Sequence, residues 1–66
     1  MKKFNENLRD LRLRLGKTQK EVAEDMGLQV STYSNYEQGL REPSLDVLKI
    51  ICDYYGVTAD YLIGRE

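Results

Sequence analysis

Residues 18–39 read TQKEVAEDMGLQVSTYSNYEQG, and this stretch holds two short helical patterns with only a few residues between them. Thr18 and Glu21 have the spacing of a capping box, which predicts that a helix begins directly after Thr18. Gly27 and Gly39 can adopt the left-handed conformation in which helices end. The stretch therefore predicts two helices joined by a short turn, over residues 19–26 and 30–38.

The second of these helices is polar but largely uncharged. Tyr33 and Tyr36 lie three residues apart and can both face inward, which leaves the short side chains on the other faces. These short side chains are Ser31, Thr32, Ser34 and Asn35. Such groups can donate and accept hydrogen bonds at base edges in the major groove of DNA. A helix that serves only to keep a domain in solution would more often carry Lys and Glu.

Further helices are predicted on both sides of this stretch, because glycines divide the chain into helix-sized segments and no segment alternates like a strand. Leu8, Leu11 and Leu15 form an apolar stripe in the preceding segment. Ser44 and Thr58 are suitable N-caps for two helices that follow. The first of these two has a predicted apolar stripe of Leu45, Leu48, Ile51 or Cys52, and Tyr55. We therefore expect an all-α chain of five helices, over about residues 5–15, 19–26, 30–38, 45–55 and 59–63.

The length and composition exclude several kinds of protein. A chain of 66 residues forms one domain at most, so its small core must suffice alone or be supplemented by dimerisation. One cysteine, Cys52, and no histidine permit neither an internal disulfide nor a structural zinc site. A lone cysteine fits a reducing compartment. With no apolar run near the ~20 residues of a membrane span and no signal peptide, we expect a cytoplasmic protein without metal or cofactor.

The net charge of −1 is not typical of a nucleic-acid binder, but the charge is unevenly distributed. Residues 1–33 hold seven Lys or Arg and five Asp or Glu, whereas residues 34–66 hold three and six. This asymmetry permits a cationic face, although ordinary surface scatter would also explain it. If the chain binds DNA, its acidity predicts weak non-specific affinity and a shallow dependence on salt.

Taken together, these residues resemble the phage-repressor/Cro-like helix-turn-helix family of transcriptional regulators. The resemblance extends from about Leu8 to Gly64, and it rests on four segments in order: TQKEVA, MGLQVSTYSNYEQG, EPSLDVL and YYGVTADYLIG. It implies a five-helix, lambda-repressor-like DNA-binding domain. It also implies a sequence-specific regulator, a dimeric repressor that reads a short palindromic operator with its third helix in the major groove.

The resemblance further assigns roles to individual residues. The base-reading positions are Gln29, Val30, Ser31 and Asn35. Asn35 and Gln29 can each pair with an adenine through two hydrogen bonds, and Val30 can touch a thymine methyl group. The alternatives are a plain helix cap for Gln29, packing against the turn for Val30, and ordinary surface positions for Ser31 and Asn35.

Phosphate contacts are expected at the start of the second helix, where helix amides favour an anion, and also around the end of the third. The expected residues are Lys17, Thr18, Gln19, Gln38, Gly39 and Arg41. Thr18 can also act as a cap, and the two basic residues can also be solvated surface charges. The resemblance also implies that Arg12 and Glu37 form a structural ion pair that fixes the third helix.

Other functions are less well supported by the residues. An interaction protein of the antitoxin type would need a long tail, whereas only Arg65 and Glu66 follow the last glycine. An enzyme is not expected, because there is no histidine and the acids are dispersed. No ligand-sensing segment is evident, so we expect regulation through abundance, a protein partner or dimerisation. The expected dimer face is Leu13, Tyr54, Tyr61 and Ile63.

Overall fold

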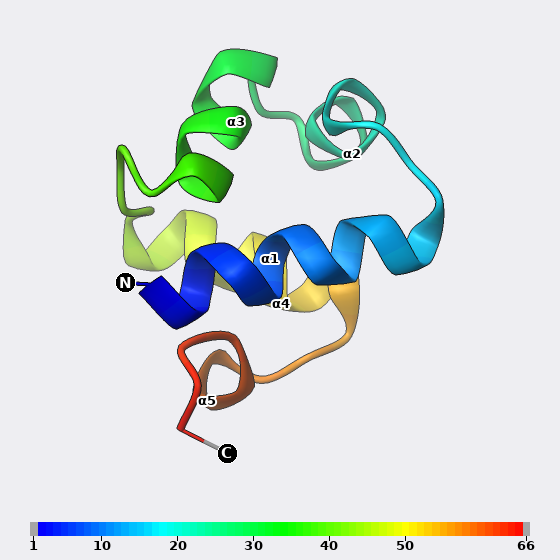
Figure 1. Cartoon of the computed structure of the whole chain (residues 1–66). Coiled ribbons are helices and arrows are strands. Elements are labelled where there is room, and N and C mark those ends of the chain that lie inside the picture. The colour runs from blue at the N-terminus through cyan, green and yellow to red at the C-terminus, as the bar shows by residue number, and fades with distance from the viewer. Residues whose placement is uncertain (1, 66) are drawn as a thin grey trace.

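The computed structural model describes residues 2–65, with side chains from Lys3 to Arg65. Its fold is all-α, and within this part of the chain no strand is present. The helices are α1 (Lys2–Leu15), α2 (Gln19–Met26), α3 (Val30–Gln38), α4 (Leu45–Tyr55) and α5 (Ala59–Leu62) (Figure 1). None of these helices is long and apolar enough to cross a membrane.

Figure 1 shows α1 crossing the middle of the molecule, with α2 and α3 on one side of it and α5 on the other. α1 packs against α3 and α5, and α2 packs against α3 and α4. The buried apolar core draws on all five helices, and consists of Phe4, Leu8, Leu11, Val22, Ala23, Tyr33, Tyr36, Ile51 and Leu62. Because Tyr33 and Tyr36 are part of this core, the opposite side of α3 faces outward.

Three helices begin at the caps that the sequence predicts. The Thr18 hydroxyl accepts from the Glu21 amide at 3.1 Å, while the Glu21 carboxylate accepts from the Thr18 amide at 2.9 Å. Ser44 accepts from the Val47 amide at 3.3 Å at the start of α4. Thr58 accepts from the Tyr61 amide at 3.0 Å at the start of α5. These side chains satisfy amides that have no partner within the helix.

Two helix bounds differ from the prediction. α1 begins at Lys2 rather than at about residue 5, because Phe4 is buried in the core and holds the first turn in place. No Ser, Thr, Asp or Asn marks that start, so the sequence pattern missed it. α5 ends at Leu62 rather than at residue 63, since Gly64 takes a left-handed φ of +81° directly afterwards.

Two leucines were wrongly predicted to lie in the apolar stripes. Leu15 is 50% exposed, because the buried stripe of α1 runs through Phe4, Leu8 and Leu11 and ends before the last turn. Leu45 is 85% exposed, since it is the first residue of α4 and lies beyond the core. Helical spacing identifies one side of a helix but not how far the packing partner extends along it.

Candidate nucleic-acid interface

The turn between α2 and α3 is closed by backbone hydrogen bonds. Gly27 adopts a φ of +74°, and its amide donates to the Glu24 carbonyl at 3.1 Å. The Leu28 amide donates to the Ala23 carbonyl at 2.8 Å. Ala23 is fully buried, so no larger side chain separates the two helices there. These bonds end α2 and set the path of the short turn, and α3 then packs against α2, as in a helix-turn-helix.

The four residues expected to read bases all lie on the outward side of α3 or just before it. Gln29, Val30 and Ser31 are exposed, and Asn35 is half-buried. Gln29 is the N-cap residue of α3, but its side chain makes no capping hydrogen bond. Val30 is 39% exposed, so it is not packed away against the turn. All four side chains are therefore reachable from outside.

Arg12 joins three segments at the inward side of α3. Its Nε and Nη2 donate to Oε2 and Oε1 of Glu37 at 2.8 and 3.1 Å, which is a bidentate pair. Its Nη1 donates to the Lys17 carbonyl at 3.0 Å. The exposed fractions of the two side chains are 13% for Arg12 and 3% for Glu37. The ion pair thus connects α1, the loop before α2 and the end of α3.

Gln19, which was expected at a phosphate, also contributes to this cluster. Its Nε2 donates to Oε1 of Glu37 at 3.1 Å, so the first residue of α2 is tied to the last turn of α3. Burial alone would raise the pKa of Glu37, but the hydrogen bonds from Arg12 and Gln19 outweigh it and hold this pKa below its ordinary value. Glu37 therefore stays ionised at neutral pH.

A second polar contact holds α3 in place by joining it to α4. The hydroxyls of Tyr33 and Tyr55 lie 2.6 Å apart, joining α3 to α4. Burial raises the pKa of Tyr33 far above its ordinary value and that of Tyr55 to about 12. Both phenols remain neutral and act as a hydrogen-bonded pair. The sequence indicated that Tyr33 faces inward, but no pattern in it identified Tyr55 as the partner.

Lys17 has partners that the sequence did not indicate. Its Nζ lies 2.8 Å from Oδ2 of Asp25 and 3.4 Å from the Tyr54 hydroxyl, and 5.9 Å above the Tyr54 ring. Tyr54 itself donates to Oδ2 of Asp25 at 2.5 Å. The hydrogen bonds from Lys17 and Tyr54 lower the pKa of Asp25. Lys17 and Tyr54, expected at phosphate and at a dimer face respectively, are thus joined in one intramolecular cluster.

The other residues expected at phosphate surround α3 in different ways. Thr18 and Gln38 are exposed, and Gln38 donates to the Ser34 hydroxyl at 2.7 Å. Arg41 is exposed in the loop after α3. Gly39 adopts a φ of +77° with the Asn5 side chain packed against it. The structure brings Gln19 and Gln38 to the same hollow, whereas Arg41 lies apart from it.

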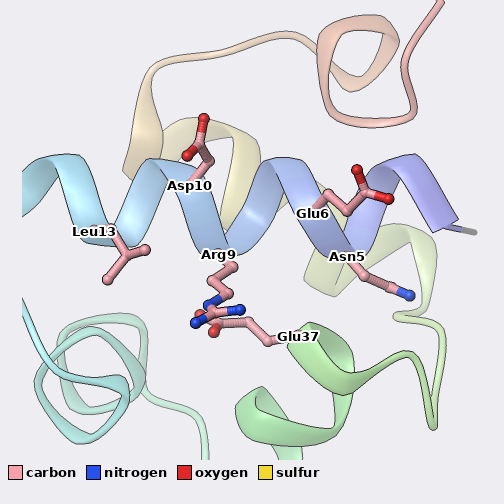
Figure 2. Close-up of a pocket in the computed structure, with 6 residues that line it drawn as sticks. All are labelled: Asn5, Glu6, Arg9, Asp10, Leu13 and Glu37. Atoms are coloured by element: carbon pink, nitrogen blue, oxygen red, sulfur yellow. The ribbon is translucent and has the colours of Figure 1, made fainter.

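Two open hollows lie between α1 and the end of α3. The larger one, of about 570 Å³, is lined by Arg9, Arg12, Gln19, Glu37 and Gln38. The smaller one, of about 290 Å³, is lined by Asn5, Glu6, Arg9, Asp10, Leu13 and Glu37. Figure 2 shows Arg9 and Glu37 extending from α1 and α3 into the space between these helices, while Asp10 points away.

Arg9 is a site residue that the sequence interpretation missed. It borders both hollows, yet in the sequence analysis it was only one of the seven Lys or Arg of residues 1–33. The density of positive charge from Arg9 to Lys20 was the available signal. Neither hollow resembles a metal site, and within residues 2–65 no three His, Cys, Asp or Glu side chains come together to hold a metal ion.

Comparison with known proteins agrees with this geometry. A family model described as helix-turn-helix matches residues 8–62. The chain is 38% identical over 63 residues to the HTH-type transcriptional regulator ImmR of Bacillus subtilis (strain 168), which covers 96% of this chain and 50% of that protein. It is 35% identical over 61 residues to the cryptic phage CTXphi transcriptional repressor RstR of Vibrio cholerae, covering 92% and 55%.

A further relative is the HTH-type transcriptional activator BcrR of Enterococcus faecalis. It is 35% identical over 63 residues, covering 96% of this chain and 31% of that protein. The chain therefore spans about half the length of the first two relatives, and less of the third.

Proposed function

Since the chain belongs to the Cro/C1-type helix-turn-helix family of transcriptional regulators, we propose that it binds double-stranded DNA sequence-specifically and represses transcription. The observation that carries the proposal is the outward side of α3. It presents uncharged polar side chains, while Tyr33, Tyr36 and Glu37 anchor the opposite side in the molecule. A rigid helix with such a face fits the major groove.

In the proposed complex, Asn35 and Gln29 hydrogen-bond to base edges, Ser31 donates or accepts according to the base, and Val30 touches a thymine methyl group. The exposure of Gln29, Val30 and Ser31 supports these roles. Each bidentate contact of this kind discriminates against a wrong base by about 1–3 kcal/mol. Together they would define a short half-site.

Phosphates would be bound on both sides of the reading face. Thr18 and Gln19 lie at the start of α2, where the capped helix end favours an anion. Gln38, Gly39 and Arg41 lie at and after the end of α3, and all three are exposed. Such contacts fix the position and register of the protein on the duplex, while base contacts determine the sequence.

We further propose that the protein acts as a homodimer on a palindromic operator. Tyr61 and Ile63 are half-buried, so apolar surface remains at α5 for a partner copy. Leu13 is 54% exposed but lines the hollow between α1 and α3, on the other side of α1 from α5, so it is a weaker candidate than the sequence suggested. Tyr54 is a weaker candidate than the sequence suggested, because its hydroxyl is bonded to Asp25. A two-fold symmetric dimer would place two α3 helices in successive major grooves.

Repression rather than activation is also part of the proposal. One similar protein carries the name of a repressor, and another carries the name of an activator. A transcription assay with the selected DNA placed over, and then upstream of, a promoter would separate the two. Repression is supported if the protein reduces the amount of transcript when the selected DNA overlaps the promoter, and does not increase it when that DNA lies upstream.

The proposal is tested by selection from a random double-stranded DNA library, followed by sequencing of the bound fraction. We expect an enriched inverted repeat whose half-sites lie about one helical turn apart. Enrichment of a single, unrepeated half-site would contradict the dimer but keep the recognition. No enrichment even at low salt would overturn sequence-specific binding and direct the search toward a protein partner.

A further inference from the structure

The larger hollow has the composition of an anion site. Two guanidinium groups and two carboxamides line it, and its one carboxylate, Glu37, is already neutralised by Arg12 and Gln19. With Arg12 and Glu37 balancing each other, the charge of Arg9 remains in excess. An open, positively charged hollow with additional amide donors suits a phosphate group.

Unlike Arg12, Arg14 and Lys17, Arg9 is not bound by another side chain in the described part of the chain. Arg12 binds Glu37, Arg14 binds Asp10 at 3.1 Å, and Lys17 binds Asp25. Across residues 2–65, the Arg9 guanidinium has no hydrogen-bond or ion-pair partner, although it lies beside Glu37 in the hollow. The Glu37 carboxylate instead accepts from Arg12 and Gln19. A ligand would therefore meet a free Arg9 and an occupied Lys17.

The hollow also adjoins the proposed reading face. Gln38 lies one turn beyond Asn35 on the outward side of α3, and Gln19 is the first residue of α2. Both residues line the hollow together with Arg9. A DNA strand that passes α3 and reaches the start of α2 therefore runs past the mouth of this hollow.

We propose that Arg9 is a phosphate-binding residue for DNA, supplied by α1, and that it provides the charge that the sequence interpretation assigned to Lys17. This assignment rests on the proposed DNA binding. Arg9 extends toward a backbone phosphate at the hollow, where Gln19 and Gln38 can add hydrogen bonds. Lys17 stays on Asp25 and Tyr54 and contributes to the fold.

The chain offers closely matched controls. Arg9→Gln, Arg14→Gln and Lys17→Gln each remove one positive charge from the same half of the protein, so they change the net charge equally. Arg9 and Arg14 are moreover on the same helix and both exposed. Arg9→Lys keeps the charge at the hollow. Thermal unfolding of each variant shows whether the fold is retained before binding is compared.

The measurement is the affinity for DNA between about 0.05 and 0.3 M salt. It uses the duplex selected by the unaltered protein and an unrelated duplex of equal length. The logarithm of the association constant falls linearly with the logarithm of the salt concentration, and the loss of one phosphate contact makes this slope shallower by about 0.9 for each bound copy. Over a tenfold range of salt concentration, a change of about 0.9 in the slope corresponds to a change of about eightfold in affinity. We expect this change for Arg9→Gln on both duplexes, with Arg14→Gln, Lys17→Gln and Arg9→Lys close to the unaltered protein.

The outcomes separate this assignment from the general proposal. Equal slopes for the unaltered protein, Arg9→Gln and Arg14→Gln would overturn the Arg9 site while DNA binding stands. If Lys17→Gln reduces the salt dependence of binding and Arg9→Gln does not, Lys17 and not Arg9 makes the phosphate contact. An unaltered protein that binds neither duplex would overturn both the site and the proposed function.

Discussion

Arg12 and Glu37 form a bidentate ion pair between the middle of α1 and the last turn of α3, with N–O distances of 2.8 and 3.1 Å. Gln19 donates to the same carboxylate from the start of α2. One carboxylate thus joins the three helices that would meet DNA. Because α3 is only nine residues long, its orientation depends on such tertiary contacts rather than on its own helix propensity.

Replacing Glu37 by Gln should lower the free energy of unfolding by about 2 kcal/mol, because it leaves the largely buried charge of Arg12 without its counter-ion. For a domain of this size, such a loss corresponds to a fall in Tm of roughly 8–16 °C. Thermal unfolding followed by circular dichroism measures it. Glu24→Gln, at an exposed position on α2, is the matched control and should leave Tm nearly unchanged. Equal effects of the two changes would show that the pair does not stabilise the fold.

The free energy of unfolding should also fall at acidic pH, because the Glu37 carboxylate becomes protonated there. The pKa of Glu37 lies below its ordinary value of 4.5, so the unfolded chain takes up this proton more readily than the folded one. The contribution of Glu37 is therefore complete above about pH 5, and it is lost as the pH falls through the lower folded pKa. Asp25, whose pKa is also lowered, adds to the acid sensitivity of the unaltered protein.

Urea unfolding at several pH values checks this expectation. The stability difference between the unaltered protein and Glu37→Gln should be largest near pH 7 and should shrink toward pH 2, where Glu37 itself becomes neutral. A difference that stays constant across this range would mean that Glu37 does not titrate with a lowered pKa.

The hydroxyl pair of Tyr33 and Tyr55 gives a prediction with a control on the same helix. Tyr33→Phe removes a 2.6 Å hydrogen bond and leaves the Tyr55 hydroxyl without its partner, which costs about 1 kcal/mol. Tyr36→Phe keeps an equally buried ring at a position with no hydrogen-bond partner within the described part of the chain, so it should cost less. Chemical denaturation of both variants tests this. A larger loss for Tyr36→Phe would contradict the assigned role.

Gly39 and Gly27 both end helices with a positive φ, but only Gly39 is crowded. A Cβ at Gly39 would clash with Nδ2 of Asn5, whereas nothing in the described part of the chain lies within 4 Å of a Cβ at Gly27. The left-handed conformation costs an alanine about 1–2 kcal/mol at either position, and Gly39→Ala must in addition displace Asn5. Unfolding free energies should therefore fall further for Gly39→Ala. Combining it with Asn5→Ala should remove the extra loss; persistence of that loss would refute the crowding.

The helices and their caps follow from local rules, and so were largely accessible to sequence reasoning. The Thr18 capping box and the glycine at residue 27 act within a few residues, and both were correctly predicted. The start of α1 was missed because Phe4 holds it through burial against distant residues rather than through a cap. Leu15 and Leu45 were misjudged for a related reason, since helical periodicity does not show where the core ends.

The partners of polar side chains were harder to foresee. The resemblance implied the pair of Arg12 and Glu37, which is present in the structure, but nothing in the sequence showed that Gln19 joins it. Nor did it show that Lys17 binds Asp25, leaving Arg9 as the free cation at the hollow. Such choices depend on distances between helices, which the sequence does not display.

The central claim is that the outward side of α3 reads DNA bases, and Asn35 tests it most directly. The affinities of the unaltered protein and of Asn35→Ala would be measured on the selected duplex and on every single-base change of one half-site. The account predicts that Asn35→Ala loses discrimination of about 1–3 kcal/mol at one position of the half-site and keeps it elsewhere. Uniform weakening on all duplexes, with discrimination unchanged at every position, would contradict the claim.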